Sequence, residues 1–395
     1  MLRVCSNARH KRPGTGLGKP QLTNAAEAGD FAYDLTMVLT DRLLMGPGPS
    51  NPYPEATAAF VRPMLGHLDP EFITVLDETI ERLRAVWQTS NQLTLPVSGT
   101  GSAGMEAAFV NTVEPGDAVV IGVNGLFGER MCDVARRCGA QVTRVDAPWG
   151  TPLDAEALLG AHPNPKLIAL VHAETSTGVR NDVESVAAGK GDALLLADCV
   201  TSLGGIPVDI DGWGVDVAYS GTQKCLGVSP GLSPFTMNER ARQRRVPVPQ
   251  SWYLDLGMIG DYTSGATRKY HHTAPIAMIF SLHAGLGALL DEGLKDAWER
   301  HERCGTALQS GLQELGLELW APEGHRLPEL TTVVVPEGVD DAATRRSLLG
   351  EFGIEIGGGV GEWAGRIWRI GCMGHTARMS NVTLLLSALA QLLGR

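Results

Sequence analysis

A glycine-rich turn is the first stretch whose residue types and spacing could do chemistry. Residues 98–105 read Ser-Gly-Thr-Gly-Ser-Ala-Gly-Met, a Gly-x-Gly-x-x-Gly spacing between the apolar run 93–97 and an expected helix. Free backbone N–H groups at a helix N-terminus, flanked by hydroxyls, bind phosphate. A dinucleotide site would also need an acid at the end of the next strand, and that strand ends in Asn124. The turn is a candidate phosphate cup, although a tight strand-to-helix turn gives the same pattern.

A carboxylate and a lysine follow further along the chain. Asp198 ends the apolar run 194–198, and ligands of open α/β sheets gather at the carboxyl ends of strands. An aspartate there can also simply cap the next turn. Lys224 closes the sequence Ser-Gly-Thr-Gln-Lys after another expected strand. The alternative interpretation is an ordinary surface lysine, which the small residues next to Lys224 in the sequence make less suitable here.

A phosphate cup, a strand-end Asp and a lysine together match the chemistry of pyridoxal 5'-phosphate. The lysine forms a Schiff base with the cofactor aldehyde, the carboxylate pairs with the pyridine nitrogen, and the helix end holds the phosphate. Phe127, just after the expected strand 118–123, is placed to stack on the ring, unless it is a core residue. Arg369 lies in an apolar strand, where an unpaired guanidinium is costly. A bound carboxylate would pair with it, as would Glu355 or Glu362.

Cysteine and histidine patterns argue against other chemistries. The seven cysteines are scattered without a Cys-x-x-Cys pair, at positions 5, 132, 138, 199, 225, 304 and 372. They indicate thiols in a reducing cytoplasm, with no disulfide framework. His271-His272 is the only histidine pair, and adjacent side chains point in different directions. We therefore expect no metal site.

The surrounding elements predict a mostly parallel α/β sheet that positions these residues. Residues 71–87 carry the i, i+3, i+4 apolar stripe of an amphipathic helix. Short apolar runs then alternate with helical stretches, which is typical of strands buried on both faces between helices. The expected strands are 118–123, 141–145, 167–172, 193–198, 216–220 and 232–237.

The chain divides into three expected parts. Residues 1–40 begin with a basic, Gly- and Pro-containing stretch that indicates a flexible arm. Residues 41–292 form the large domain, whose aromatic-rich and irregular stretch 247–272 suggests an interface or active-site segment. Residues 293–395 form a smaller α/β domain. It follows a helix at 276–291 and contains a helix at 294–315, strands at 331–335 and 365–370, and a final helix.

Composition excludes several function classes. The 395 residues carry a formal net charge of −11, with 44% hydrophobic and 19% charged residues, as in globular proteins. An acidic balance argues against a nucleic-acid partner. The longest apolar runs, such as 193–197, fall far short of the ~20 residues that cross a bilayer, so we expect no membrane span.

Taken in order, these motifs make residues 44–393 resemble the class V aminotransferases of fold type I, in particular the alanine-glyoxylate/serine-pyruvate group. The matching text is Gly46-Pro-Gly-Pro-Ser-Asn51, Ser98-Gly-Thr-Gly-Ser102, Glu114-Pro-Gly-Asp117, Asn124-Gly-Leu-Phe-Gly128, Glu174-Thr-Ser-Thr-Gly178, Ser202-Leu-Gly-Gly205, Ser220-Gly-Thr-Gln-Lys224, Tyr270-His-His-Thr273 and Arg369-Ile-Gly371. The resemblance implies a large domain with a mostly parallel seven-stranded sheet between helices, plus a smaller C-terminal α/β domain.

The resemblance also assigns residues to roles. Lys224 and Asp198 are the implied catalytic residues, and Gly48, Thr175 and Arg369 the implied substrate-binding residues. The residues implied around the cofactor are Thr100, Gly101, Ser102, Phe127, Thr175, Asp198, Val200, Gln223, Lys224, Tyr270 and Thr273. Of these, Tyr270 and Thr273 resemble residues that reach the phosphate of the neighbouring subunit, which implies a homodimer. Ser102 replaces a histidine of some relatives, and Phe127 a tryptophan of the mammalian ones.

The implied function is transfer of an amino group from alanine or serine to glyoxylate or pyruvate by a ping-pong mechanism. Sibling activities on pyridoxamine or 2-aminoethylphosphonate with pyruvate are the closest alternatives, and residues 371–376 resemble the pyridoxamine branch somewhat. Cysteine desulfuration would need a mobile nucleophilic cysteine, for which Cys372 is the candidate. A non-catalytic binding protein is disfavoured because both Asp198 and Lys224 are present.

Overall fold

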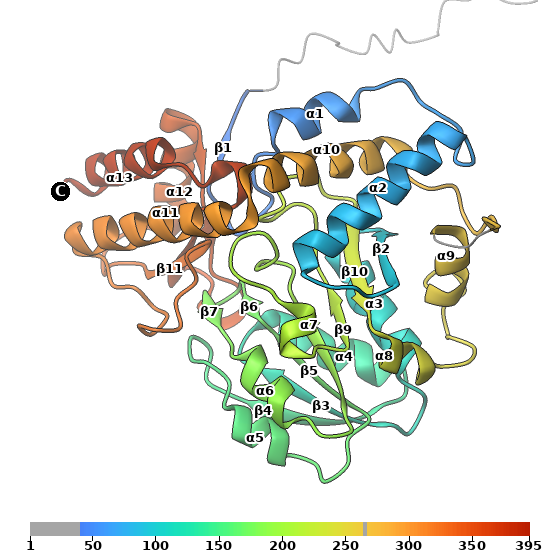
Figure 1. Cartoon of the computed structure of the whole chain (residues 1–395). Helices are drawn as coiled ribbons and strands as arrows, with labels where there is room; N and C mark the ends of the chain where they lie inside the picture. Colours follow the sequence, from blue (N-terminus) through green and yellow to red (C-terminus); the bar gives the residue numbers. More distant parts are fainter. Residues whose placement is uncertain (1–39, 264–266) are drawn as a thin grey trace, which may run out of the picture. The chain divides into compact units, whose positions relative to one another are not determined.

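The computed structural model describes residues 40–263 and 267–395. Residues 41–395 form one compact unit. The predicted flexible arm lies outside the described residues except for Thr40, and the division at residues 292 and 293 stays a prediction. Figure 1 shows the elements of the compact unit.

A seven-stranded sheet forms the centre of the larger part, as predicted. Its order is β2-β10-β9-β8-β5-β3-β4, and β10 alone runs antiparallel to its neighbours. The strands are β2 (Leu93–Ser98), β3 (Ala118–Val123), β4 (Gln141–Asp146), β5 (Leu167–Val171), β8 (Leu194–Asp198), β9 (Val217–Tyr219) and β10 (Leu232–Met237). These bounds confirm the predicted strands to within two residues.

Helices cover both faces of this sheet because its central strands are apolar on both faces. In β8, Leu195 and Ala197 face one hydrophobic core, while Leu194 and Leu196 face another. Such two-sided burial is the mark of a parallel α/β sheet. The first core includes residues of α1 (Pro54–Phe60), α2 (Pro70–Trp87), α5 (Ala155–Gly160), α6 (Val183–Gly189), α7 (Ile210–Trp213) and α10 (Ile276–Glu292). The second includes residues of α3 (Gly101–Thr112), α4 (Leu126–Arg137), α8 (Glu239–Gln243) and α9 (Leu256–Thr263).

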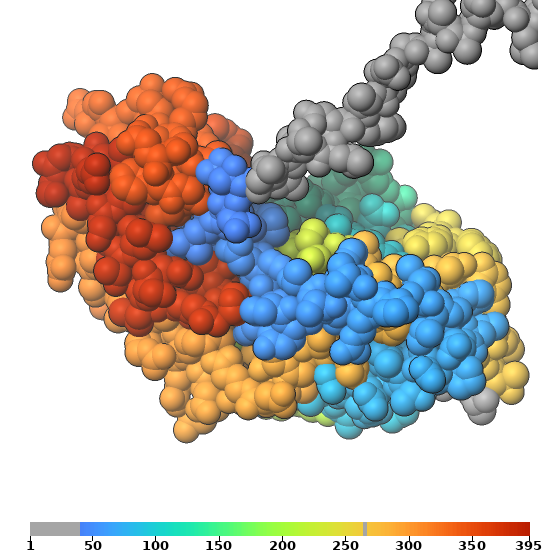
Figure 2. Space-filling view, turned by 90° about the horizontal axis from the view of Figure 1, so that it is seen from above, coloured from blue at the N-terminus to red at the C-terminus, as the bar shows by residue number. Residues whose placement is uncertain are grey.

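The outer helices are set by local signals in the sequence. Helix α2 begins where the Asp69 carboxylate accepts the backbone N–H of Glu71, and Pro70 occupies its first turn. It ends at Gln88 in the left-handed conformation, φ 51°. Both α1 and α2 pack against α10, and Figure 2 shows the blue N-terminal helices beside this gold helix.

The C-terminal part is built around a second, three-stranded antiparallel sheet of order β11-β14-β13. Its elements are α11 (Leu294–Glu314), β11 (Leu330–Val334), α12 (Asp341–Phe352), β12 (Ile354–Glu355), β13 (Gly357–Gly358), η1 (Gly361–Trp363), β14 (Ile367–Gly371), η2 (Gly374–Thr376) and α13 (Met379–Leu393). The predicted helices and strands of this part are confirmed. Strand β1 (Leu43–Leu44) pairs with β12, so the described chain begins on this core.

The stretch 247–272 contains more structure than predicted. Helix α9 lies within it, and Leu256, Ile259 and Tyr262 are buried along one side. Gly257 and Gly260 lower its helix propensity. The helix has only eight residues, which is too short for its apolar period to be evident in the sequence. The expectation of an irregular stretch was therefore wrong over Leu256–Thr263.

Two short strands complete the fold near the sheet edge, β6 (Ala173–Glu174) and β7 (Val179–Arg180), which pair with each other.

Across residues 40–263 and 267–395, no single helix is both long and apolar enough to cross a membrane. Helices α10 and α11 meet that test of length and composition only together, across an 84° bend.

Candidate active site

The predicted chemistry-bearing residues lie at the carboxyl ends of the parallel strands. Strand β2 leads into the glycine-rich turn, β3 into Phe127, β8 ends in Asp198, and β9 precedes Lys224. Strands β8 and β9 are neighbours, and their register sets Asp198 beside Tyr219. The sheet therefore gathers residues that are more than a hundred positions apart in the sequence.

The glycine-rich turn forms an open helix N-terminus. Helix α3 starts at Gly101, and its N-cap residue Thr100 makes no side-chain cap bond. Within the described residues, the backbone N–H groups of Gly101 and Ser102 donate to no other group. A Cβ on Gly101 would stand 2.9 Å from Cγ2 of Val200, so the missing side chain lets α3 approach β8. The helix end is thus free to bind an anion.

Gln223 lies beside this helix end with an unsatisfied polar atom. A Cβ on Gly221 would meet Oε1 of Gln223 at 2.8 Å and Cγ1 of Val200 at 3.3 Å. In the part of the chain that the structure describes, this buried Oε1 has no hydrogen-bond partner. Turned by 180°, this amide would present its NH2 group instead, and an NH2 donor beside free backbone N–H groups fits a phosphate. The cup residues therefore fit the phosphate of pyridoxal phosphate.

Asp198 is buried, with 2% of its surface exposed, and both of its oxygens are bonded. Oδ1 accepts the backbone N–H of Val200 at 2.9 Å, and Oδ2 accepts the hydroxyl of Tyr219 at 2.7 Å. The first bond is the turn cap considered as the alternative. Burial raises the pKa of Asp198 to about 6. A carboxyl group without a cationic partner at such depth is suited to a protonated ring nitrogen.

Lys224 is also buried, at 8% exposure, which excludes the interpretation as a surface lysine. Burial, followed by the positive charge of Arg369, lowers the pKa of its amine to about 8. Its Nζ donates to the carbonyl of Pro47. A Cβ on Gly48 would stand 2.6 Å from this Nζ, so Gly48 borders the amine directly. The lysine is thus held in a narrow place and is more easily deprotonated than in water.

Arg369 has no carboxylate partner among the described residues. Its Nε donates to the carbonyl of Gly358 at 2.7 Å and its Nη1 to that of Thr175 at 3.3 Å. The alternative of a salt bridge to Glu355 or Glu362 is not observed. Burial lowers the pKa of the guanidinium. Two backbone bonds orient the side chain and leave Nη2 free for an anion.

Phe127 is half-buried at the edge of the core and is held by groups that the sequence did not reveal. Its backbone N–H donates to the Glu174 carboxylate at 3.2 Å, and that carboxylate also accepts the Ser176 hydroxyl at 2.6 Å. Burial raises the pKa of Glu174 to about 7. The Arg130 guanidinium lies 5.0 Å from the Phe127 ring centroid and 3.3 Å from the Ser102 hydroxyl. Glu174 is the last residue of β6, and Arg130 lies three residues after Phe127, but only the fold shows their contacts.

Tyr270 and Thr273 lie outside this constellation. Tyr270 is 59% exposed, and its hydroxyl lies 3.4 Å from that of Thr273. Within the described residues neither side chain bonds to Lys224, Asp198 or α3. The single chain does not bring them into its own site, and their predicted place at a partner's phosphate stays a proposal.

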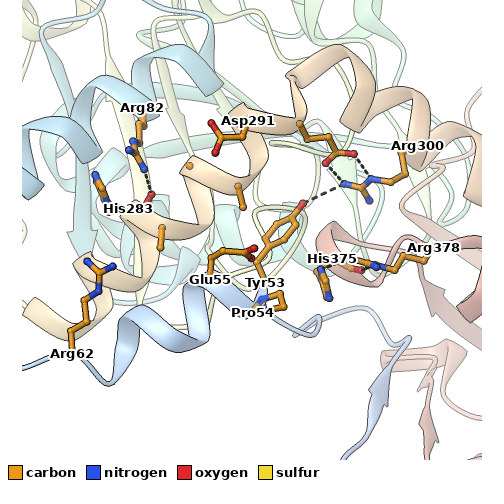
Figure 3. Close-up of a pocket in the computed structure, with 14 residues that line it drawn as sticks. Tyr53, Pro54, Glu55, Arg62, Arg82, His283, Asp291, Arg300, His375 and Arg378 are labelled. Atoms are coloured by element: carbon orange, nitrogen blue, oxygen red, sulfur yellow. Dashed lines mark hydrogen bonds and ion pairs between the residues drawn. The ribbon is translucent and has the colours of Figure 1, made fainter.

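A cavity of about 760 Å³ lies elsewhere, between α1, α10, α11 and η2. Figure 3 shows the side chains that line this cavity, with Arg62, Arg82 and His283 on one side and Arg300, His375 and Arg378 on the other. Two dashed bonds join Arg300 to Glu292, at 2.5 and 2.7 Å. No residue predicted from the sequence as a site residue lines this cavity.

Fold and site together define a pyridoxal-phosphate-dependent transferase of fold type I. The family profile "Aminotransferase class-V" matches residues 50–380. An alanine–glyoxylate aminotransferase of Callithrix jacchus is 40% identical over 363 residues, 89% of this chain and 87% of that protein. An (S)-ureidoglycine–glyoxylate transaminase of Bacillus subtilis is 37% identical over 380 residues, covering 90% and 91%.

A solved structure agrees with these relatives. The crystal structure of an alanine–glyoxylate aminotransferase from Nostoc sp. superimposes with a TM-score of 0.88 at 49% identity, covering 90% of this chain and 96% of that one. The chain belongs to the class V aminotransferase family. It is a pyridoxal-phosphate-dependent transaminase, as the sequence motifs predicted.

Proposed function

We propose that this transaminase moves the amino group of a small amino acid, alanine or serine, to glyoxylate or pyruvate. The observation that carries the proposal is Arg369, a partly buried guanidinium with no carboxylate partner in the described chain. Its positive charge lowers the pKa of Lys224. The relatives named above support glyoxylate as the acceptor, because the alanine–glyoxylate and the ureidoglycine–glyoxylate transaminases are both named for that substrate.

The residues divide the work as follows. Pyridoxal phosphate, when bound, supplies an aldehyde for the amino group and a ring that withdraws electrons from the α-carbon. Lys224 holds the cofactor and then carries a proton between the α-carbon and the cofactor, since its lowered pKa leaves part of it neutral near pH 7 to 8. Asp198 keeps a proton on the ring nitrogen. Thr100, Gly101, Ser102 and Gln223 hold the phosphate, with Val200 and Phe127 beside the ring.

Arg369 serves both halves of the reaction. A donor amino acid and an acceptor keto acid each carry one carboxylate, so the same guanidinium can hold them in turn, which is the basis of the proposed ping-pong cycle. The carbonyl of Thr175 accepts a hydrogen bond from this arginine, and Gly48 leaves little room beside Lys224. The narrow space favours small side chains.

A homodimer with shared sites is part of this proposal. Large apolar side chains are exposed on two segments, namely Val61, Met64 and Leu68 between α1 and α2, and Trp252, Tyr253 and Met258 near α9. Tyr270 lies against the first segment, because the His67 and Tyr270 ring centroids lie 5.1 Å apart. Exposed apolar surface of this kind marks an interface, and Tyr270 and Thr273 are proposed to reach the partner's phosphate from it.

Desulfuration is disfavoured by the position of Cys372. Its side chain is fully buried in the C-terminal core, and its backbone N–H donates to Glu329. A nucleophilic cysteine must reach the substrate, and this one is packed away from solvent.

A substrate panel tests the proposal. We expect the protein to transfer the amino group of alanine and of serine to glyoxylate. Arg369→Leu should lower kcat/KM for each of these substrates, with a loss of transition-state stabilisation of about 2–5 kcal/mol, the range for truncating one member of a desolvated charge pair. Arg369→Lys keeps the positive charge but not the two parallel N–H donors of the guanidinium, so its kcat/KM should fall less than that of Arg369→Leu. If ureidoglycine were the preferred donor, the proposed donor would be wrong. Efficient turnover of pyridoxamine or 2-aminoethylphosphonate with pyruvate would instead show that the protein has one of the sibling activities.

A further inference from the structure

Two adjacent histidines form a continuous chain of hydrogen bonds. His271 Nε2 lies 3.1 Å from the Trp252 carbonyl oxygen, and His271 Nδ1 lies 2.8 Å from His272 Nδ1. His272 Nε2 lies 2.7 Å from the Ser98 hydroxyl. All four ring nitrogens are therefore used, and none is left to solvent or to a metal.

The chemistry of the two ends fixes the direction of this chain. A carbonyl oxygen only accepts, so His271 Nε2 must carry a proton. A neutral His271 then accepts at Nδ1, so His272 donates from its own Nδ1. His272 Nε2 is left as an acceptor, and the Ser98 hydroxyl donates to it. This arrangement is the one that two neutral rings adopt, and burial together with the neighbouring His271 lowers the pKa of His272, which favours the neutral form of that ring.

Aromatic packing holds the pair in place. The Trp252 ring lies 4.5 Å from that of His271, and the rings of Tyr253 and Tyr262 lie 5.2 and 6.2 Å from that of His272. His271 is 3% exposed. Rings fixed on several sides keep their hydrogen-bond directions, so the pair behaves as a rigid connection.

The connection joins the phosphate cup of one chain to the segment of the same chain that is proposed to reach the partner's phosphate. Ser98 is the last residue of β2, and the cup residues Thr100, Gly101 and Ser102 follow it directly. The adjacent Gly99 is fixed by a bond from its N–H to the Gly231 carbonyl, 3.0 Å. At the other end, Tyr270 and Thr273 flank the histidine pair on either side in the sequence.

We infer that His271 and His272 are positioning residues, a directional relay that ties the segment bearing Tyr270 and Thr273 to Ser98, beside the phosphate cup of the same chain, and so sets the geometry of the cofactor-phosphate sites in the proposed dimer. The inference rests on the proposed function, because the phosphate concerned is that of pyridoxal phosphate. It assigns to the pair a role in binding the phosphate group rather than in the chemistry at Lys224.

The test compares two probes that differ only in the phosphate, pyridoxal phosphate and pyridoxal, on the full-length protein freed of cofactor. His272→Phe keeps the ring packing and removes both nitrogens, and Ser98→Ala removes the other end of the bond. We expect each to weaken pyridoxal phosphate binding about tenfold, the upper range for one hydrogen bond, with pyridoxal affinity unchanged. The double variant should be no weaker than either single variant, because both break the same relay.

Controls separate this inference from a general loss of structure. His162→Phe changes a partly exposed histidine outside the site, whose ring bonds only to the backbone N–H of nearby Asn164 among the described residues, and should alter neither affinity. His272→Gln provides an amide oxygen that can accept from Ser98 and should recover part of the loss. Equal losses for both probes, additive losses in the double variant, or unchanged affinity in His272→Phe would overturn the inference. Failure of the native protein to bind pyridoxal phosphate at Lys224 would instead overturn the proposed function.

Discussion

Asp198 and Tyr219 act as a pair at the residue scale. The position of Asp198 at the end of an apolar run made it predictable, whereas its tyrosine partner was not. Tyr219 lies 21 positions later, and only the register between β8 and β9 sets it opposite Asp198. A hydroxyl that donates to a buried carboxylate stabilises the charged form and lowers the pKa of Asp198 against the effect of burial.

Tyr219→Phe tests this pairing. Loss of the hydroxyl should raise the pKa of Asp198 above about 6, so less of it is ionised at a given pH. We expect pyridoxal phosphate affinity to fall roughly tenfold or more, as for a hydrogen bond to a charged group, with a larger loss at pH 6 than at pH 8. Tyr53→Phe removes another buried hydroxyl, which accepts from Arg300, and should not change this affinity. A pH-independent loss would argue against the pairing.

Lys224 gives a second prediction through its lowered pKa. Only the neutral amine attacks an aldehyde, and the amine becomes neutral as pH rises through about 8. The rate at which the cofactor-free protein binds pyridoxal phosphate covalently should therefore rise from pH 6.5 and level off above pH 9, as stopped-flow absorbance would show. Arg369→Leu removes a positive neighbour, so it should shift this profile to higher pH. A profile that is flat, or that shifts downward, would contradict the assigned environment.

At the scale of elements, the sequence allowed the strands and long helices to be predicted because their signals are local. Strand β8 is apolar throughout, and α2 has both an apolar stripe and a capping aspartate. Helix α9 was missed because eight residues with two glycines show no clear period. The contacts of Glu174 and Arg130 were missed for a different reason, since they depend on how β6, α3 and α4 pack together.

Helix α3 must lie very close to the sheet for its N-terminus to form the cup. A Cβ on Gly104 would overlap the Ser233 hydroxyl and stand 2.9 Å from Cβ of Tyr219. Gly104→Ala should lower the free energy of unfolding by about 1–3 kcal/mol through overpacking and also weaken cofactor binding. Gly160→Ala adds a methyl group where no atom lies within 4 Å and should leave both nearly unchanged. Urea unfolding and cofactor titration measure the two effects, and a stable Gly104→Ala protein would mean that α3 is less tightly packed.

At the scale of the whole molecule, the site described in one chain lacks the two residues predicted to come from a neighbour. Tyr270 and Thr273 are exposed, next to exposed apolar side chains. The sequence predicted this only through the resemblance, because no local pattern tells which subunit a side chain serves. Residues 1–35 of the predicted arm, which lie outside the described residues, are expected from their composition to be dispensable for catalysis.

Mixed dimers test whether the sites are shared. We expect Lys224→Ala to be inactive and the double variant Tyr270→Ala with Thr273→Ala to bind the cofactor phosphate at least about tenfold more weakly, having lost two hydroxyl contacts. A dimer with one subunit of each kind contains one site in which every residue is native. Such dimers, isolated by two affinity tags, should regain native cofactor affinity in half of their sites. No recovery would mean that each chain completes its own site.

The central claim is that Lys224, which borders Gly48 and feels the charges of Asp198 and Arg369, is the residue that binds pyridoxal phosphate. Borohydride reduction of the native holoenzyme, followed by proteolysis and mass spectrometry, tests it most directly. We predict a single phosphopyridoxyl group on the peptide that contains Lys224, and none in Lys224→Ala, because Lys224 is the amine that borders Gly48 among the described residues. A phosphopyridoxyl group on any other lysine of the native protein would contradict the assignment of Lys224.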